Sequence, residues 1–201
     1  MRKTLLIITA LMLIVGCSSP EPINAEKLIE EDGLKYHPDT KELYSGVAVW
    51  YYDNGQKRAE GTYKDGRPNG KVTAWHENGQ KGYEGTYKDG ELDGLHTQWY
   101  ENGQKKNEGT FKDGEYDGIS TGWYENGQKE EEVTYKDGKE EGLWTEWHEN
   151  GQKWIEATYK DGERVGKWTL WYKNGQKHEE ETYKDGELID YKAWDIDGNK
   201  R

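Results

Sequence analysis

Cysteine is almost absent from this 201-residue chain, which contains a single copy, Cys17. One thiol cannot form an intrachain disulfide and supplies too few ligands for a cysteine-based zinc site. The sequence therefore excludes both an intrachain disulfide and a cysteine-based zinc site.

Aliphatic residues and phenylalanine are also scarce. Hydrophobic residues make up 31% of the chain and the net charge is −12, while Leu, Ile, Val and Phe together account for about one residue in seven, a composition typical of intrinsic disorder. However, the chain holds 10 Trp and 15 Tyr, and they recur at fixed positions. We therefore expect a folded chain.

A surplus of basic residues is missing as well. There are 40 Asp and Glu against 28 Lys and Arg, and most lysines lie beside an acid, so there is no basic stripe. Phosphate backbones bind through Lys and Arg that release counterions. Nucleic acid is therefore excluded as a partner.

Residues 1–16 are predicted to be an export signal. Two basic residues precede an apolar run over 5–15, and about eleven residues are too few for a membrane span, which needs roughly 20. The run ends in IVGC at residues 14–17, which resembles the bacterial lipobox. That resemblance implies cleavage before Cys17, acylation of Cys17 and a membrane attachment through lipid. Because Ser18 follows the cysteine, the outer membrane is favoured if the cell envelope has two membranes.

The segments on either side of the repeats are assigned as follows. Residues 17–33 are predicted to be a lipid-anchored tether, with a short helix over 25–32 capped by Asn24. Residues 34–45 are interpreted as an N-terminal capping half-repeat. Residues 190–201, where Trp194 and Asp197-Gly198 echo repeat positions, are interpreted as a C-terminal capping partial repeat, since the end units of arrays are commonly atypical.

Residues 46–189 contain six consecutive copies of a 24-residue unit without insertions. A strict period of this length is typical of repeat arrays, in which each unit buries its faces only against its neighbours. The units open at Gly46, Gly70, Gly94, Gly118, Gly142 and Gly166.

Each unit contains one Asn-Gly and one Asp-Gly, such as Asn102-Gly103 and Asp113-Gly114, flanked by aromatic and β-branched residues. Both pairs favour type I′ hairpin turns, in which the two central residues have φ > 0. The sequence therefore predicts an all-β fold: an elongated antiparallel meander of tandem β-hairpins in a single coiled sheet.

Two-residue turns also predict the register and the two faces. Pairing outward from Asn102-Gly103 places Trp99 on one face, Lys105 and Phe111 on the other, and Gly94 opposite Phe111. The aromatics then form two rows, and no second layer is encoded to cover either. The rows are Tyr51, Trp75, Trp99, Trp123, Trp147 and Trp171, and Tyr52, His76, Tyr100, Tyr124, His148 and Tyr172.

The unit resembles the bacterial variant of the MORN repeat. The likeness is carried by W-Y/H-E-N-G-Q-K, by E-x-T-Y-K-D-G, and by a glycine four residues later, over about 144 residues in six copies. The resemblance implies tandem β-hairpins, a role in binding or scaffolding, and no catalytic residue. Some members of that family are described as antitoxins.

Patterns that carry chemistry in other proteins are explained here by the repeat. Residues 118–122 read GISTG, which fits the nucleophile elbow of serine hydrolases, but the same slots elsewhere read GLHTQ and GLWTE.

His76 and His148 replace tyrosine three units apart, and the acidic pairs do not follow the order of a calcium loop. The recurring glutamates are identical exposed copies, which do not provide an acid and a base in distinct environments. We predict no catalytic residue, no metal and no cofactor.

The aromatic rows are the candidate partner-binding residues, because Trp and Tyr supply rigid contact area for proteins or sugars. The same rings could instead hold a core-poor sheet together. The candidates are Trp75, Trp99, Trp123, Trp147, Trp171, Tyr100, Tyr124 and Tyr172.

The favoured hypothesis is a non-catalytic envelope lipoprotein whose repeats form a protein-binding scaffold. The alternatives are carbohydrate or peptidoglycan binding through an aromatic row, and an antitoxin or immunity-type partner of a toxin.

Overall fold

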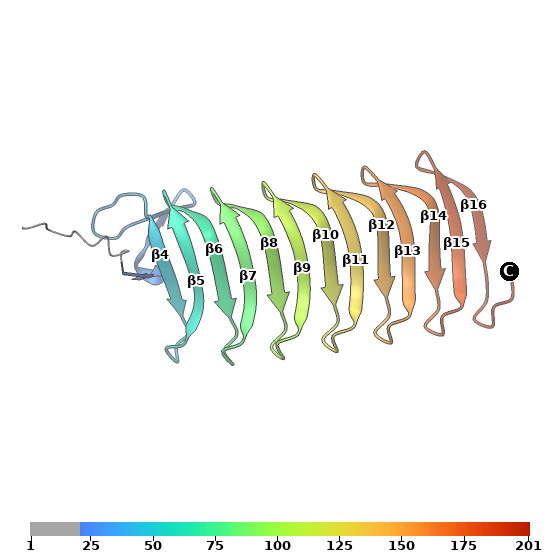
Figure 1. Ribbon diagram of the computed structural model, residues 1–201, viewed down its shortest axis with the longest axis horizontal. Coiled ribbons are helices and arrows are strands. Elements are labelled where there is room, and N and C mark those ends of the chain that lie inside the picture. Colours follow the sequence, from blue (N-terminus) through green and yellow to red (C-terminus); the bar gives the residue numbers. More distant parts are fainter. Residues whose placement is uncertain (1–20) are drawn as a thin grey trace, which may run out of the picture.

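A computed structural model describes residues 21–201 of the chain. One 14-stranded sheet contains β1 and β4 to β16 in sequence order, and a separate two-stranded sheet contains β2 and β3. Figure 1 shows the long sheet with its strands side by side from β4 to β16. The strands of the array are β4 (Gly46–Tyr51), β5 (Lys57–Lys64), β6 (Arg67–Trp75), β7 (Lys81–Lys88), β8 (Glu91–Trp99), β9 (Lys105–Lys112), β10 (Glu115–Trp123), β11 (Lys129–Lys136), β12 (Lys139–Trp147), β13 (Lys153–Lys160), β14 (Glu163–Trp171), β15 (Lys177–Lys184) and β16 (Glu187–Ala193).

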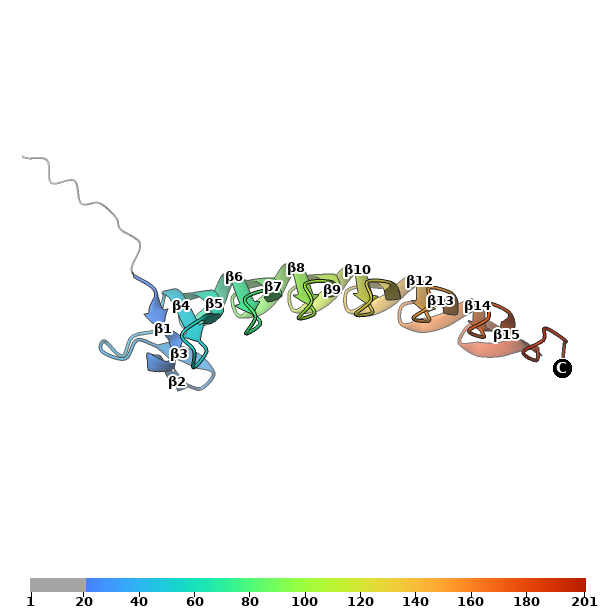
Figure 2. The same ribbon diagram turned by 90° about the horizontal axis from the view of Figure 1, so that it is seen from below.

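The predicted all-β antiparallel meander is confirmed. Every strand from β4 to β16 pairs antiparallel with the next strand in the sequence, and the predicted pair Gly94 with Phe111 is present. Seen from below, the array is a single layer along its length (Figure 2). None of the helices in the described residues is long and apolar enough to cross a membrane.

The Asp-Gly turns have the predicted geometry. Asp113 has φ 48° and Gly114 has φ 83°, and Lys112 pairs directly with Glu115. Two positive φ values in a two-residue loop define a type I′ turn, whose twist matches that of the flanking strands.

The Asn-Gly turns differ from the prediction. Only the glycine has positive φ, as in Gly103 at 84°. The Tyr100 amide donates to the Gln104 carbonyl, and the Gly103 amide donates to the Tyr100 carbonyl, so the loop has three residues and ends in a glycine bulge. The Asn102 side chain accepts a hydrogen bond from the Gln104 amide, which favours this loop over the type I′ turn.

A separate bulge in β9, where Lys106 is the extra residue, corrects one face assignment. The register shifts between Gln98 and Trp99, so Trp99 pairs with Lys105. Lys105 therefore lies on the same face as Trp99 and Glu108, and not on the opposite face as predicted. An extra residue in one strand reverses which side the following residues occupy.

The N-terminal segment is only partly as predicted. Asn24 does cap a helix, with its side chain accepting from the Glu26 amide at 3.0 Å, but that helix is the short 3-10 element η1 (Ala25–Lys27). The helix predicted over 25–32 is wrong beyond it, because β2 (Ile29–Glu31) and β3 (Leu34–Tyr36) form a hairpin. Asp32 and Gly33 both have positive φ, so this Asp-Gly forms a turn like those of the repeats.

The end of the predicted tether thus belongs to the fold. The strand β1 (Ile23–Asn24) pairs parallel with β4. The export signal and the start of the tether, including Cys17, lie outside the described residues. After β16, the Gly198 amide donates to the Asp195 carbonyl and the Asp195 amide donates to the Asn199 carbonyl. Residues 195–199 therefore repeat the hydrogen bonds of an Asn-Gly loop.

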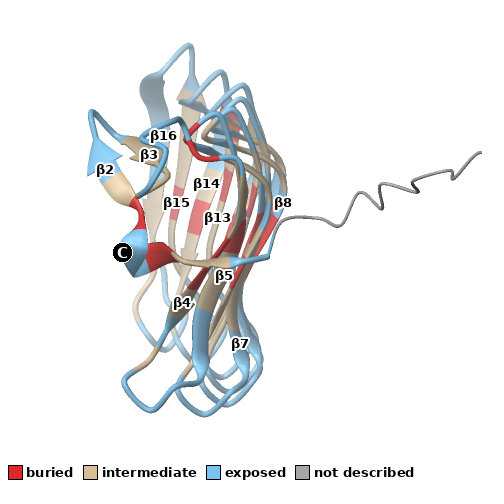
Figure 3. Cartoon of the chain, turned by 90° about the vertical axis from the view of Figure 1, so that its left-hand side faces the viewer, coloured by how far each residue is buried: buried red, intermediate tan, exposed pale blue. Residues whose placement is uncertain are grey.

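The two faces of the sheet carry different side chains. We call the face on which the N-terminal segment packs the inner face, and the opposite face, which carries Thr97 and Trp99, the outer face. In Figure 3 the strands are bowed, β2 and β3 lie on the hollow side, and the buried residues lie in the middle of the strands and in the N-terminal segment. Small and aromatic side chains dominate the inner face, whereas threonines are buried on the outer face at Thr73, Thr97, Thr121, Thr145 and Thr169.

Candidate functional site

The second predicted aromatic row links each unit to the next. The Tyr100 hydroxyl donates to the Trp123 carbonyl at 2.8 Å, and the Tyr124 hydroxyl donates to the Trp147 carbonyl at 2.7 Å. His76 Nε2 lies 2.9 Å from the Trp99 carbonyl. Because a neutral imidazole with its proton on Nε2 donates as a hydroxyl does, histidine can replace tyrosine in this row. The same contact is made by Tyr52, His148 and Tyr172.

The tryptophan row is covered by lysines of the preceding unit. Lys105 Nζ forms an ion pair with Glu108 on the outer face and lies 5.6 Å from the centroid of the Trp123 ring. This places an ammonium over an aromatic face, a cation–π contact. The same arrangement joins Lys81 to Trp99, Lys129 to Trp147, Lys153 to Trp171 and Lys177 to Trp194. These tryptophans are half-buried.

A third ladder runs along the Asn-Gly loops. Asn102 Nδ2 donates to the Glu125 carbonyl at 3.0 Å, in the loop of the next unit. The same bond recurs at Asn78, Asn126, Asn150 and Asn174. The loop asparagine thus shapes its own turn and binds its neighbour.

The residues predicted to bind a partner therefore also contribute to the structure of the array. Trp75, Trp99, Trp123, Trp147 and Trp171 line one row, and Tyr100, Tyr124 and Tyr172 supply hydroxyls to the unit interfaces. The structure brings them together as rows and not as one site, with shallow clefts between units. One cleft, of about 490 Å³, is lined by Gln104, Lys105, Trp123, Asn126 and Gly127. Partner binding by these residues stays a prediction.

The inner face contains a chain of ring contacts in the second and third units. His96 lies edge-on to Tyr83 at 5.1 Å and to Phe111 at 5.5 Å, between ring centroids, and the Phe111 ring packs at a tilt against Tyr116 at 4.1 Å. His96 is only 7% exposed and its Nδ1 has no hydrogen-bond partner among the described residues. Burial lowers the pKa of His96, which favours the neutral ring that packs among these aromatics.

Two glutamates face each other elsewhere on the inner face. Glu131 pairs directly with Glu146 in the ladder between β11 and β12. Burial raises the pKa of Glu131, and the neighbouring Glu130 raises it further. The pKa of Glu146 is raised by burial and then by Glu131 and Glu130. Gly122 makes room beside the pair, since a Cβ there would lie 3.0 Å from Glu131 Cγ.

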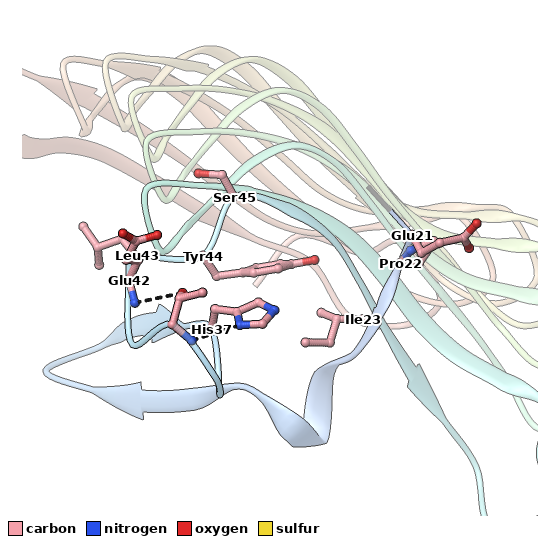
Figure 4. Close-up of a pocket in the computed structure, with 9 residues that line it drawn as sticks. Glu21, Pro22, Ile23, His37, Glu42, Leu43, Tyr44 and Ser45 are labelled. Carbon is pink, nitrogen blue, oxygen red and sulfur yellow. Dashed lines mark hydrogen bonds between the residues drawn. The ribbon is translucent and has the colours of Figure 1, made fainter. Parts of the chain in front are cut away.

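A further cleft lies where the N-terminal segment meets the array. It has a volume of about 480 Å³, and its walls include Ile23, Leu43 and Tyr44. Figure 4 shows His37 beside Tyr44, whose ring centroid is 6.3 Å away. His37 Nδ1 accepts from the Asp39 and Thr40 amides, so this ring is fixed by its own turn.

The G-x-S-x-G pattern does not form a nucleophile elbow in the structure. Ser120, in the G-x-S-x-G pattern, lies in the middle of β10, is 5% exposed, and pairs with Gly109 and Val133. A nucleophile elbow requires an exposed strand-to-helix turn. Within residues 21–201, no group of three or more His, Cys, Asp or Glu side chains is placed to hold a metal ion.

Six segments of the chain match the family model described as the MORN repeat variant: 44–65, 68–89, 92–113, 116–137, 140–161 and 164–185. The chain belongs to the MORN repeat variant family. Successive matches begin 24 residues apart, which is the period of the sequence and of the hairpins. No curated protein matches the chain. MORN repeats form a repeat-based interaction module that is generally non-enzymatic.

Sequence reasoning missed three features of the MORN array. It did not place a lysine over the tryptophan of the next unit, although a lysine stands three residues before the glutamate in every unit. It did not connect the loop asparagines, which also recur in every unit. It gave no special place to Glu131 and Glu146, because nothing in the local sequence shows that they meet.

Replacing Tyr124 by phenylalanine tests the inter-unit hydrogen bond. We expect Tyr124→Phe to lower the free energy of unfolding by about 1 kcal/mol, because the Trp147 carbonyl loses its donor. Tyr51→Phe is the matched control, since the Tyr51 side chain is 41% exposed and outside the ladder. Urea unfolding followed by tryptophan fluorescence measures both, and equal losses in the two variants would contradict a role for the bond.

The glutamate pair predicts a pH dependence. A carboxyl whose folded pKa is raised stabilises the fold at low pH, and this contribution is lost as pH rises from the unfolded value of about 4.3 through the raised value. We expect Glu131→Gln with Glu146→Gln to increase the free energy of unfolding at neutral pH by roughly 0.5 kcal/mol. The gain should vanish in acid.

Urea titrations at several pH values check this result. The same double change at the exposed loop residues Glu77 and Glu101 serves as the control and should show no such pH dependence. A gain at Glu131 and Glu146 that persists in acid would show that charge is not its cause.

Proposed function

We propose that this MORN array is a non-catalytic scaffold that binds a protein partner on its inner face. One observation carries the proposal. The chain's own N-terminal segment already docks on that face, where Ala25 and Leu28 pack against Ala48 and Tyr44. Ala25 is 5% exposed and Leu28 is 9% exposed. A short polypeptide segment can therefore bury apolar side chains on the inner face of a unit.

Beyond the first hairpin, the backbone of the inner face is the same from unit to unit, whereas its side chains differ. The slot of Glu131 is Ala59 in the first unit and Asn107 in the third, and the slot of Glu146 is Ala74 in the second unit. By contrast, the ladder slots repeat Trp, Asn, Lys and Glu. Constant residues hold the units together, and the varied inner slots provide different chemistry at each unit for recognising a partner.

The charge of these slots favours a partner with basic side chains. In the described residues, the outer-face glutamates form ion pairs with lysines, as in Glu84 with Lys81, whereas Glu131 and Glu146 face each other. A cation placed between them would relieve their repulsion and would replace the hydration that the two carboxylates lose on burial. The lysine-covered tryptophans leave less ring surface for a sugar, so the carbohydrate alternative has weaker support.

We also propose that the scaffold is exported and anchored in the cell envelope through lipid on Cys17. The support is the sequence alone: the basic and apolar residues 1–16 and the IVGC pattern. Anchoring would hold the acidic array close to a membrane and leave its faces open.

Capture from intact envelopes tests the scaffold. The variant Glu131→Ala with Glu146→Ala copies a pair that the chain already contains, because Ala59 and Ala74 pair in the same way. We expect a protein that wild type captures to be reduced about tenfold by this change. The control Glu77→Ala with Glu101→Ala removes the same charge from exposed loops and should capture normally.

The outcomes separate the possibilities. Equal capture by both variants would place the partner elsewhere than on the inner face. No capture above a scrambled-surface control would remove the support for a scaffold. In the same cells, Cys17→Ser should shift the chain from the membrane fraction to the soluble fraction, and an unchanged distribution would contradict the lipid anchor.

A further inference from the structure

Three consecutive units expose an aliphatic side chain at the same slot of the outer face. Leu95 is 56% exposed, Ile119 is 58% exposed and Leu143 is 53% exposed. Each lies two residues before a buried outer-face threonine and therefore projects from the same face. Their exposure shows that they contribute little to the fold, so another explanation is needed for three large apolar residues in water.

The flanking units carry lysine at this slot. Lys71 precedes the three aliphatic residues and Lys167 follows them, and these lysines form ion pairs with Glu84 at 2.9 Å and Glu180 at 3.9 Å. We call Leu95, Ile119 and Leu143 the outer stripe. Because units repeat every two strands, the stripe is about 20 Å long.

The outer-face glutamates beside the stripe are paired with lysines. Glu108, Glu132 and Glu156 each form an ion pair with a lysine of the same unit, Lys105, Lys129 or Lys153. A second copy approaching this face thus meets paired charges, although the whole chain has a net charge of −12. Between two identical chains, self-neutralised surfaces avoid the like-charge repulsion that the acidic inner face would produce.

The order of residues along the stripe is symmetric. From Lys71 to Lys167 the slots contain Lys, Leu, Ile, Leu and Lys, with Ile119 in the centre. In a two-fold dimer the same patch serves both copies, so residues that are equivalent by reversal must be compatible. A two-fold axis beside Ile119 places Leu95 of one copy opposite Leu143 of the other.

The area is also sufficient. The six strands β8–β13 span about 29 Å across the sheet, and strands of eight or nine residues are about 27 to 30 Å long, which gives on the order of 800 Å². A stable interface buries about 800 Å² on each partner. We propose that the outer stripe is the contact surface of a two-fold homodimer in which two arrays pack through their outer faces.

Measuring the oligomeric state tests this dimer. The variant Leu95→Lys, Ile119→Lys, Leu143→Lys is suited to the test, because the chain itself carries lysine at this slot in two units. All chains are full-length and carry Cys17→Ser, so that no acyl chain contributes to association. The control Leu188→Lys, Ile189→Lys changes residues that are 50% and 59% exposed on β16, outside the stripe.

By sedimentation velocity, we expect wild type and the control to be dimeric at about 10 µM and the stripe variant to dissociate at least about tenfold more readily. Wild type that stays monomeric at roughly 100 µM, or a stripe variant that dimerises like wild type, would overturn the proposal. Circular dichroism verifies that each variant is folded.

Crosslinking adds a geometric check. Sheets stacked face to face lie about 10 Å apart, so a bismaleimide of similar reach should join Ile119→Cys chains into a covalent dimer. Leu188→Cys on β16 is the control and should remain mostly uncrosslinked. Equal crosslinking at the two positions would place the contact elsewhere and reject the outer stripe.

Discussion

Beyond the backbone pairing of its strands, the array is joined at every unit boundary by a hydrogen bond from a Tyr or His side chain to the tryptophan carbonyl of the next unit. A single sheet has no second layer to bury its faces, so side-chain packing alone supplies little stabilisation across units. The row from Tyr52 to Tyr172 joins one unit to the next at the loop end of the strands. The Asn ladder joins the loops themselves, and lysines such as Lys105 reach over the following tryptophan. Stability is therefore a sum of nearest-neighbour contacts.

Because the same few slots make all of these contacts, the other slots are free to vary. The inner face uses that freedom to bury the N-terminal segment at Ala48 and to hold a ring cluster around His96. It also tolerates the facing pair Glu131 and Glu146, which costs stability at neutral pH. The outer face keeps its charges paired and exposes Leu95, Ile119 and Leu143. One backbone thus carries two surfaces of different chemistry, and both proposals rest on that difference.

The turns show how a local irregularity in the backbone determines which side chains lie on a face of the sheet. Asp113-Gly114 forms the type I′ turn that its sequence specifies, whereas Asn102 binds the Gln104 amide and produces a three-residue loop. Together with the bulge at Lys106 in β9, this loop places Lys105 on the tryptophan face. Without it, the lysine would lie on the inner face and the cation–π contact with Trp123 would be lost. The neutrality of the outer face is therefore a consequence of turn geometry.

The sequence by itself determined the period, the strands, the meander order and pairs such as Gly94 with Phe111, because turn residues and alternation are local properties of the chain. It also identified the aromatic rows, but not their partners. Which side chain reaches the next unit depends on the spacing of the strands and on a bulge. Neither feature can be predicted from the 24-residue unit alone. The N-terminal helix prediction failed after Lys27 because the hairpin at Asp32-Gly33 and packing on β4 outweighed the local cap at Asn24. Only the tertiary structure decided that Glu131 meets Glu146 and that Leu95, Ile119 and Leu143 stay in water, since both follow from which residues face each other across strands.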